Sequence, residues 1–172
     1  AAWDTIRRDI VPAILDSKSA SDPIRVWSAG CASGEEPYTV AMLLTEILGI
    51  DQFQERVKIY ATDLDEEALV EARQATYPEP KVQDLTAEQR QFFFDANDGR
   101  YTFRKDLRRS VIFGRHDLVQ DAPISKIDLL VCRNTLMYFN AETQRRILSR
   151  FHFALRDTGF LFLGKAEMML SH

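Results

Sequence analysis

Short apolar segments of strand length alternate with amphipathic segments of helix length along most of this chain, and that order constrains the fold more than any other feature. Such alternation predicts a mostly parallel sheet with helices on both faces, an α/β fold. The predicted strands cover residues 24–29, 57–62, 111–114, 127–132 and 160–164. The predicted helices cover residues 36–48, which Gly49 closes, 66–75 and 141–155. An earlier helix over 3–15 contains Pro12, which is expected to kink it or end it early.

Residues 77–109 break this alternation and are expected to form a small insertion on the main fold. A Pro-rich segment over 77–80 ends the preceding helix, and a short helix over 86–94 has Thr86 as a suitable N-cap. The Asn-Asp-Gly sequence at 97–99 predicts a turn. Short strands are predicted over 101–103 and 110–113.

Composition limits the class of protein. A chain of 172 residues suits one domain with a sizeable core. Its longest apolar stretches are far below the roughly 20 residues that a membrane helix needs, and its first residues lack a signal-peptide pattern. Cys31 and Cys132 are too few for a disulfide framework, so reduced thiols are expected. The net charge of −4 gives no sign of nucleic-acid binding, so no nucleic-acid partner is expected. Taken together, these features predict a soluble, cytoplasmic protein with no membrane insertion.

Polar segments follow four of the predicted strands. They are SAGCASGEEP at 28–37, ATDLD at 61–65, HDL at 116–118 and CRN at 132–134. In a sheet of this kind, ligands bind beyond the carboxyl ends of the strands, where the strand order reverses. The four segments together therefore predict one binding site, which no single segment would establish.

The first of these loops favours a cationic ligand. Gly30 and Gly34 allow a ligand to approach the backbone closely. The spacing is not that of a dinucleotide-binding GxGxxG loop, and Glu35 and Glu36 open the following helix, where acids repel phosphate. The alternative is that both glutamates only stabilise the helix dipole, by a few tenths of a kcal/mol each.

The second and third loops suit a nucleoside. Asp63 ends a strand at the position where nucleotide-binding folds place an acid that accepts hydrogen bonds from ribose hydroxyls. Asp117 beside Leu118 offers an acceptor and an apolar contact, as an adenine ring requires. For both aspartates, simple turn chemistry is the alternative, and Asp65 is a candidate helix N-cap.

The remaining charged residues narrow the chemistry further. Arg133 and Asn134 follow an apolar strand directly, so a functional role or a buried ion pair explains Arg133 better than solvation does. His116 and His152 have no partner at metal-ligand spacing, so no metal site is expected, and a G-x-S-x-G hydrolase motif is missing. A basic run is expected to be a solvated face, with docking of an acidic partner as the alternative: Arg100, Arg104, Lys105, Arg108, Arg109 and Arg115.

Five segments, taken in order, resemble the CheR-type chemotaxis receptor methyltransferases. They lie at 25–42, 60–73, 111–118, 127–139 and 158–167, and the resemblance covers about residues 24–167. The joint presence of GEEPY, ATD, CRN-x-x-x-YF and LG-x-x-E makes it specific. The resemblance implies a class I, Rossmann-like methyltransferase fold in which 77–109 forms a small inserted antiparallel β-subdomain.

The same resemblance implies a function. The family uses S-adenosylmethionine to methylate glutamate side chains on the cytoplasmic helices of chemoreceptors, in adaptation or related signalling. Asp63 would hold the ribose, and Tyr138 would lie beside the transferring methyl group as the catalytic residue. The implied cofactor-binding positions are Glu36, Asp63, Asp117, Leu118, Cys132 and Arg133, with Asn134 adjoining.

The chain departs from the family pattern in three places. Family members carry an upstream helical domain and a T-x-F-F-R stretch that helps to line the pocket, and this chain starts just after that stretch. They also continue beyond the last predicted strand with a hairpin. The turn at 97–100 is short, which in the family goes with members that do not tether to a receptor C-terminal pentapeptide. We therefore expect an incomplete pocket, and inactivity of the isolated chain is one expected outcome.

Three other functions stay open at this point. One is a methyltransferase of the same fold with another substrate, and a second is a cofactor-binding regulatory module without turnover. A nicotinamide-dependent enzyme is disfavoured, since GxGxxG is missing and Glu35 and Glu36 would face the pyrophosphate.

Overall fold

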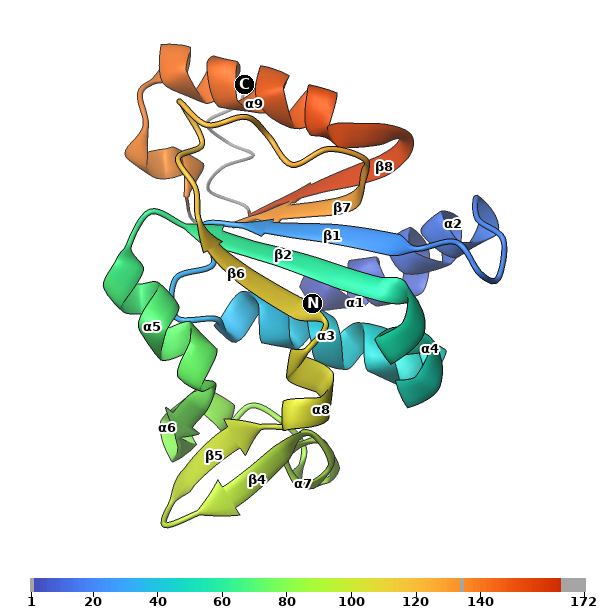
Figure 1. The fold of residues 1–172 in the computed structure, drawn as a ribbon, viewed down its shortest axis with the longest axis vertical. Helices are drawn as coiled ribbons and strands as arrows, with labels where there is room; N and C mark the ends of the chain where they lie inside the picture. The colour runs from blue at the N-terminus through green and yellow to red at the C-terminus, as the bar shows by residue number, and fades with distance from the viewer. Residues whose placement is uncertain (1, 134, 165–172) are drawn as a thin grey trace.

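The computed structural model describes residues 2–133 and 135–164, and its centre is a parallel sheet of five strands in the order β6-β2-β1-β7-β8 (Figure 1). From β1 the chain moves outward through β2 and β6, and it then returns to the other side of β1 for β7 and β8. The strand order therefore reverses between β1 and β7. The bounds are β1 (Ile24–Ala29), β2 (Val57–Asp63), β6 (Val111–Arg115), β7 (Ile127–Cys132) and β8 (Leu155–Leu163).

Helices cover both faces of this sheet, as the alternation predicts. Side chains of β1 alternate between the two faces: Val26 packs in the core beneath α3, and Trp27 packs against Phe151 of α9 on the other face. Because both faces are buried, most side chains of the central strands β1 and β7 are apolar. The helices of the main fold are α3 (Glu35–Leu48), α4 (Ile50–Arg56), α5 (Glu66–Gln74) and α9 (Ala141–Ala154).

The element α4 was not predicted. Gly49, at a φ of 87°, ends α3 as expected, but its carbonyl then accepts a hydrogen bond from the N–H of Phe53 and a second helix begins at once. Phe53 is fully buried, so packing against the core favours this helix in a segment that the apolar periodicity left unassigned.

The N-terminal helix has the irregularity that Pro12 predicts, but it lies before the proline. α1 (Ala2–Thr5), a π-helical turn η1 (Ile6–Ile10) and α2 (Val11–Asp16) follow one another without a break. Proline has no N–H, and its ring collides with the carbonyl group of residue i−4 in a regular helix. The wider π turn relieves that conflict while Ile6 and Ile14 stay buried against the sheet.

The insertion forms a second, antiparallel sheet in the order β3-β5-β4. The predicted N-cap is present: Thr86 Oγ1 accepts from the N–H of Gln89, and the Gln89 side chain accepts from the N–H of Thr86. Gly99 forms the predicted turn at a φ of 73°. The strand predicted over 111–114 lies in the parallel sheet, as expected, and is β6; the short strand suggested over 110–113 is the same element. The bounds are β3 (Thr76–Pro78), α6 (Glu79–Val82), α7 (Ala87–Phe93), β4 (Phe94–Asn97), β5 (Arg100–Phe103) and α8 (Lys105–Arg108).

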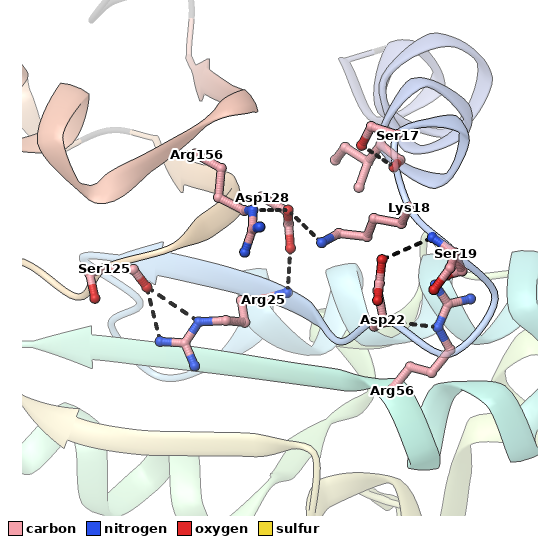
Figure 2. Close-up of polar contacts among 10 residues, drawn as sticks. Ser17, Lys18, Ser19, Asp22, Arg25, Arg56, Ser125, Asp128 and Arg156 are labelled. Atoms are coloured by element: carbon pink, nitrogen blue, oxygen red, sulfur yellow. Dashed lines mark hydrogen bonds and ion pairs between the residues drawn. The ribbon is translucent and has the colours of Figure 1, made fainter.

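A buried ion pair fixes the N-terminal segment to the amino ends of the strands (Figure 2). Asp128 on β7 is 1% exposed, and its carboxylate lies 3.0 Å from Nζ of Lys18. The same carboxylate accepts a hydrogen bond from the N–H of Arg25 at 2.9 Å, and Nε of Arg156 lies 3.8 Å away. The linker after α2 is thus tied to β1, β7 and β8 at the end of the sheet opposite to the predicted site.

None of the helices in the described part of the chain is long and apolar enough to cross a lipid bilayer.

Candidate functional site

A cleft of about 740 Å³ lies at the carboxyl ends of β1, β2, β6 and β7, where the strand order reverses. Its volume falls within the roughly 300–1,000 Å³ that is usual for small-molecule sites. All four predicted loops contribute to its wall. Six of the predicted site residues line it: Glu36, Asp63, Asp117, Leu118, Arg133 and Tyr138.

The loop after β1, residues 30–34, is called the cofactor loop below, and its backbone is strongly constrained. Gly30, Ala32 and Gly34 all have positive φ, of 78°, 50° and 97°. The N–H groups of Gly30 and Cys31 donate to the carbonyl oxygen of Thr62 at 2.8 and 2.9 Å, which fixes the loop to the end of β2. The left-handed conformation of Ala32 was not predicted, because alanine rarely adopts it.

Only glycine fits at position 30, because any side chain would collide with Thr135. A Cβ at this position would lie 2.2 Å from Oγ1 of Thr135, which itself lines the cleft. A glycine in this loop therefore allows two segments of the cleft wall to approach closely.

Asp63 joins the first two loops. Its Oδ2 accepts from the N–H of Ala32 at 2.9 Å and its Oδ1 accepts from the N–H of Asp65 at 2.9 Å. Asp65 is the N-cap of α5, as expected. Asp63 therefore stabilises the turns around it, which was the alternative to ligand binding, and it also lines the cleft. A carboxylate oxygen has two lone pairs, so both oxygens can still accept from a ligand.

The two glutamates at the start of α3 have different partners. Glu36 Oε1 accepts from the Ser28 hydroxyl at 2.7 Å, from within β1. Glu35 accepts from Ser33 and pairs with Lys81 at 2.8 Å. Burial alone would raise the pKa of the Glu35 carboxyl, but the hydrogen bonds from Lys81 and Ser33 outweigh it and lower that pKa. Both carboxylates line the cleft and are held by particular side chains, so their arrangement goes beyond a helix-dipole effect.

Neither cysteine is suited to be a nucleophile. Burial, followed by the negative charges of Asp63 and Glu36, raises the pKa of the Cys31 thiol to about 12. A protonated thiol is a poor nucleophile. Cys132 is fully buried at the end of β7 and does not line the cleft, so the structure brings this predicted position near the site without exposing its side chain.

The loop after β6 is rigidly built. Asp117 Oδ1 accepts from the N–H of Val119 at 2.8 Å, and the Asp117 N–H donates to Asp121 at 2.8 Å. Nε of Arg150, on α9, donates to the carbonyl oxygen of Leu118 at 3.1 Å. These bonds place a carboxylate and the half-buried Leu118 side by side on the wall of the cleft.

Arg133 lies over the N-terminal helix. Its guanidinium carbon is 5.2 Å from the ring centre of Trp3, and its buried Nε has no hydrogen-bond partner among the residues that the structure describes. A buried donor of this kind is rare unless a ligand or water satisfies it. Asn134, the adjoining predicted position, lies outside the described residues.

Tyr138 is at the mouth of the cleft and is 79% exposed. It ends a 3-10 turn, η2 (Leu136–Tyr138), whose buried Leu136 anchors it to the core. The Gln144 side chain donates to the carbonyl oxygens of Leu136 and Phe139 at 2.8 and 3.0 Å. The backbone around Tyr138 is therefore fixed, while its phenol faces solvent.

Part of the basic run has structural contacts. Arg104 pairs with Asp106 at 2.7 Å. Arg108 Nη1 lies within 3.5 Å of the carbonyl oxygens of Arg73 and Gln74, at the C-terminal end of α5. The expectation of a wholly solvated face is wrong for these two arginines, because each is held against the protein.

A family model described as "CheR methyltransferase, SAM binding domain" matches residues 1–172. The chain belongs to this family. A chemotaxis protein methyltransferase of Listeria monocytogenes is 35% identical over 169 residues, which cover 98% of this chain and 62% of that protein. An uncharacterized 104.1 kDa protein of Rhodobacter capsulatus is 37% identical over 161 residues, which cover 94% of this chain and 17% of that protein. The chain thus spans less than two thirds of either relative.

A solved structure shares the fold of this CheR-family chain. The S-adenosylmethionine-dependent methyltransferase from Mesorhizobium loti aligns with a TM-score of 0.50 at 18% identity, covering 88% of this chain and 51% of that one. The expected class I, Rossmann-like methyltransferase fold is thereby confirmed, including the mostly parallel sheet and the small antiparallel one.

The cofactor of this CheR-family domain is S-adenosylmethionine. The cleft residues fit such a ligand. Glu36 and Asp63 supply negative charge for a cationic group, and the unpartnered Nε of Arg133 suits a carboxylate. Gly30 keeps the backbone free of a side chain at the closest approach.

Sequence reasoning missed several residues of the CheR-family cleft. Thr135 lines it without having been predicted, and Leu64 and Phe139 line it although only the segments that contain them, and no role for either residue, were predicted. Each of the three directly follows a predicted position, so its place next to that position was the only signal that the sequence offered. Tyr77 contacts the cofactor loop from the inserted sheet, and no local signal in the sequence indicates that contact.

Proposed function

We propose that this chain is the catalytic domain of a cytoplasmic protein-glutamate O-methyltransferase that acts on the cytoplasmic helices of chemoreceptors. The observation that carries the proposal is the meeting of Glu36, Asp63 and Arg133 in one cleft at the switch point of a methyltransferase fold. Membership of the CheR family and the chemotaxis name of the Listeria monocytogenes relative support the choice of substrate.

We assign the cleft residues as follows. Asp63 accepts hydrogen bonds from the ribose hydroxyls, because it lines the cleft at the end of β2 and each of its oxygens accepts only one backbone N–H in the described chain, which leaves a lone pair. Asp117 and Leu118 contact the adenine. The guanidinium of Arg133 binds the carboxylate of the methionine moiety, which satisfies its Nε.

Charge favours S-adenosylmethionine over a phosphate-containing cofactor. Glu35 and Glu36 open α3 beside the cleft, where a pyrophosphate would meet two acids. Lys81 pairs with Glu35, while Glu36 accepts a hydrogen bond from the hydroxyl of Ser28 and lines the cleft. The negative charge of the carboxylates that line this side of the cleft favours a cationic ligand.

The reaction needs alignment more than proton transfer. When bound, S-adenosylmethionine supplies an electrophilic methyl carbon, and transfer breaks a C–S bond and forms a C–O bond. A glutamate carboxyl has a reference pKa of about 4.3, so the acceptor is ionised at neutral pH and no general base is required. Tyr138 is exposed at the mouth of the cleft, where its phenol would donate to the incoming carboxylate and orient it.

The test begins with the cofactor. S-adenosylhomocysteine, the methyl-depleted product, is titrated by calorimetry into the full-length protein and into Asp63→Ala. We expect saturable binding to the wild type and a loss of about tenfold or more in the variant, because hydrogen bonds to a charged group contribute about 1.5–3 kcal/mol. Asp65→Ala is the matched control, since it removes the neighbouring N-cap carboxylate but no group assigned to the ligand.

The methyl acceptor is tested separately. Full-length protein, radiolabelled S-adenosylmethionine and a chemoreceptor cytoplasmic fragment should yield methyl groups that mild base releases, as glutamate esters do. Binding without any base-labile label would favour the regulatory module, and label on another protein would favour a different substrate. If the wild type does not bind S-adenosylhomocysteine, the methyltransferase proposal is wrong.

A further inference from the structure

The inserted antiparallel sheet reaches the cofactor loop through two side chains. The hydroxyl of Tyr77, on β3, donates to the carbonyl oxygen of Ser33 at 2.7 Å. Nζ of Lys81, on α6, lies 2.8 Å from Oε2 of Glu35, the residue that follows the loop. Because β3 pairs with β5 through Tyr77 and Tyr101, these contacts come from an ordered element.

The cofactor loop needs contacts of this kind to hold its conformation. Ser33 lies between Ala32 and Gly34, which both have positive φ, and left-handed alanine is intrinsically unfavourable. Strained backbone of this type persists only where the surroundings fix it from several sides. Asp63 accepts from the N–H of Ala32 at the end of β2, and Tyr77 on β3 donates to the carbonyl oxygen of Ser33, the next residue.

Packing makes the contact specific. Tyr77 is 3% exposed, and a Cβ on Gly34 would lie 2.9 Å from its hydroxyl oxygen. The phenol thus occupies the space beside the left-handed glycine, and the loop cannot move toward β3 without displacing it. Ala32 and Glu35, on either side of Ser33, line the cleft, so a shift of Ser33 would move the wall of the site.

We propose that Tyr77 is a positioning residue that holds the cofactor loop in the conformation that binds S-adenosylmethionine. The inference rests on the proposed function and deepens it, because it makes the inserted sheet part of the cofactor site. Tyr77 acts through the backbone of Ser33 and is not itself placed against the ligand.

The experiment compares Tyr77→Phe with Tyr38→Phe in the full-length protein. Tyr38 is a matched control: it is 2% exposed and its ring also packs beside Gly34, but its hydroxyl donates at 2.8 Å to the carbonyl oxygen of Ala72 on α5 and not to the cofactor loop. Each variant removes one buried hydroxyl and one hydrogen bond to a backbone carbonyl oxygen; the carbonyl of Ala72 keeps the N–H of Ala75 as a donor at 3.2 Å. Thermal unfolding, S-adenosylhomocysteine affinity by calorimetry, and steady-state methylation kinetics are measured for both.

We expect both variants to lose similar thermal stability. Tyr77→Phe should raise the Kd for S-adenosylhomocysteine and the KM for S-adenosylmethionine about three- to tenfold, the effect of one net hydrogen bond, with kcat within about twofold of wild type. Tyr38→Phe should leave Kd within about twofold. An unchanged Kd in Tyr77→Phe, or an equal loss of affinity in both variants, overturns the inference. The proposed function still stands in that case, provided that the wild type binds S-adenosylhomocysteine. A wild type that does not bind overturns both.

Discussion

At the scale of single residues, the site depends on backbone conformations that few side chains permit. Gly30 has a φ of 78°, and a Cβ at this position would lie only 2.2 Å from Oγ1 of Thr135. Asp63 and Tyr77 then fix the residues that follow. The backbone of the cleft wall is therefore held by side chains on both β2 and the inserted sheet, and of these two Tyr77 does not itself line the cleft.

Gly30→Ala tests this dependence. We expect a loss of about 2–5 kcal/mol in the free energy of unfolding, since a left-handed alanine costs about 1–2 kcal/mol and overpacking adds about 1–3 kcal/mol. Urea unfolding measures the loss, and calorimetry with S-adenosylhomocysteine should show weakened binding. Gly99→Ala is the control, because Gly99 has a φ of 73° and a Cβ there would meet nothing within 4 Å. Equal losses in the two variants would argue against a collision with Thr135.

Residues that line the cleft were predictable where they belong to a loop after a strand or to the helix turn that follows it. Parallel strands bring their carboxyl ends to one edge of the sheet, and Glu36, Asp63, Asp117 and Arg133 all line the cleft there; their roles toward a ligand stay predictions. The contact of Tyr77 with Ser33 could not, because it joins the inserted sheet to a loop 44 positions earlier in the chain. No local pattern encodes such a pairing.

At the scale of elements, the long helices and the central strands follow from periodicity, and the short elements do not. α4 is seven residues long, and burial of Phe53 rather than a repeating apolar pattern stabilises it. β3 and β4 have three and four residues, and each is a strand only because it pairs with β5. Their formation depends on tertiary contacts, which a single sequence does not display.

The ion pair of Figure 2 gives a prediction at this scale. The Lys18 side chain is 6% exposed, and Lys18→Met leaves the buried Asp128 with Arg156 at 3.8 Å as its remaining cation among the ion pairs of the described chain. Removing one partner of a buried pair costs about 3–5 kcal/mol, so urea unfolding should show a loss of that size. Affinity for S-adenosylhomocysteine should stay unchanged, since the pair lies at the amino ends of the strands.

Two further variants serve as controls for Lys18→Met. Lys58→Met removes an exposed lysine from β2 and should change stability by no more than about 0.5 kcal/mol. The double variant Lys18→Met with Asp128→Asn should recover part of the loss, because it removes the uncompensated charge and keeps an acceptor for the N–H of Arg25. A single variant as stable as wild type would show that the pair does not hold the N-terminal segment.

At the scale of the whole molecule, the core and the site share buried acids that must stay protonated. Burial raises the pKa of the Cys31 thiol to about 12, with the charges of Asp63 and Glu36 adding to the effect. Burial also raises the pKa of the Tyr38 and Tyr77 phenols above their usual value. All three groups lie where the cofactor loop, α3 and the inserted sheet meet, so their titration reports on how well that junction excludes water.

Alkaline pH should therefore destabilise the fold before it reaches the tyrosines. A raised pKa means that the folded state keeps a proton that the unfolded chain releases. The free energy of unfolding is therefore highest below about pH 8.5, the pKa of the thiol in the unfolded chain, and falls as the pH rises above it. Cys31 alone should lower the free energy of unfolding by about 1.4 kcal/mol per pH unit from about pH 9. Urea unfolding of wild type and Cys31→Ala between about pH 8 and pH 10 should give a shallower slope for the variant, whereas Tyr38→Phe should keep the wild-type slope in this range because phenols ionise near pH 10. Identical slopes for wild type and Cys31→Ala would mean that water reaches the thiol and that the floor of the cleft is open.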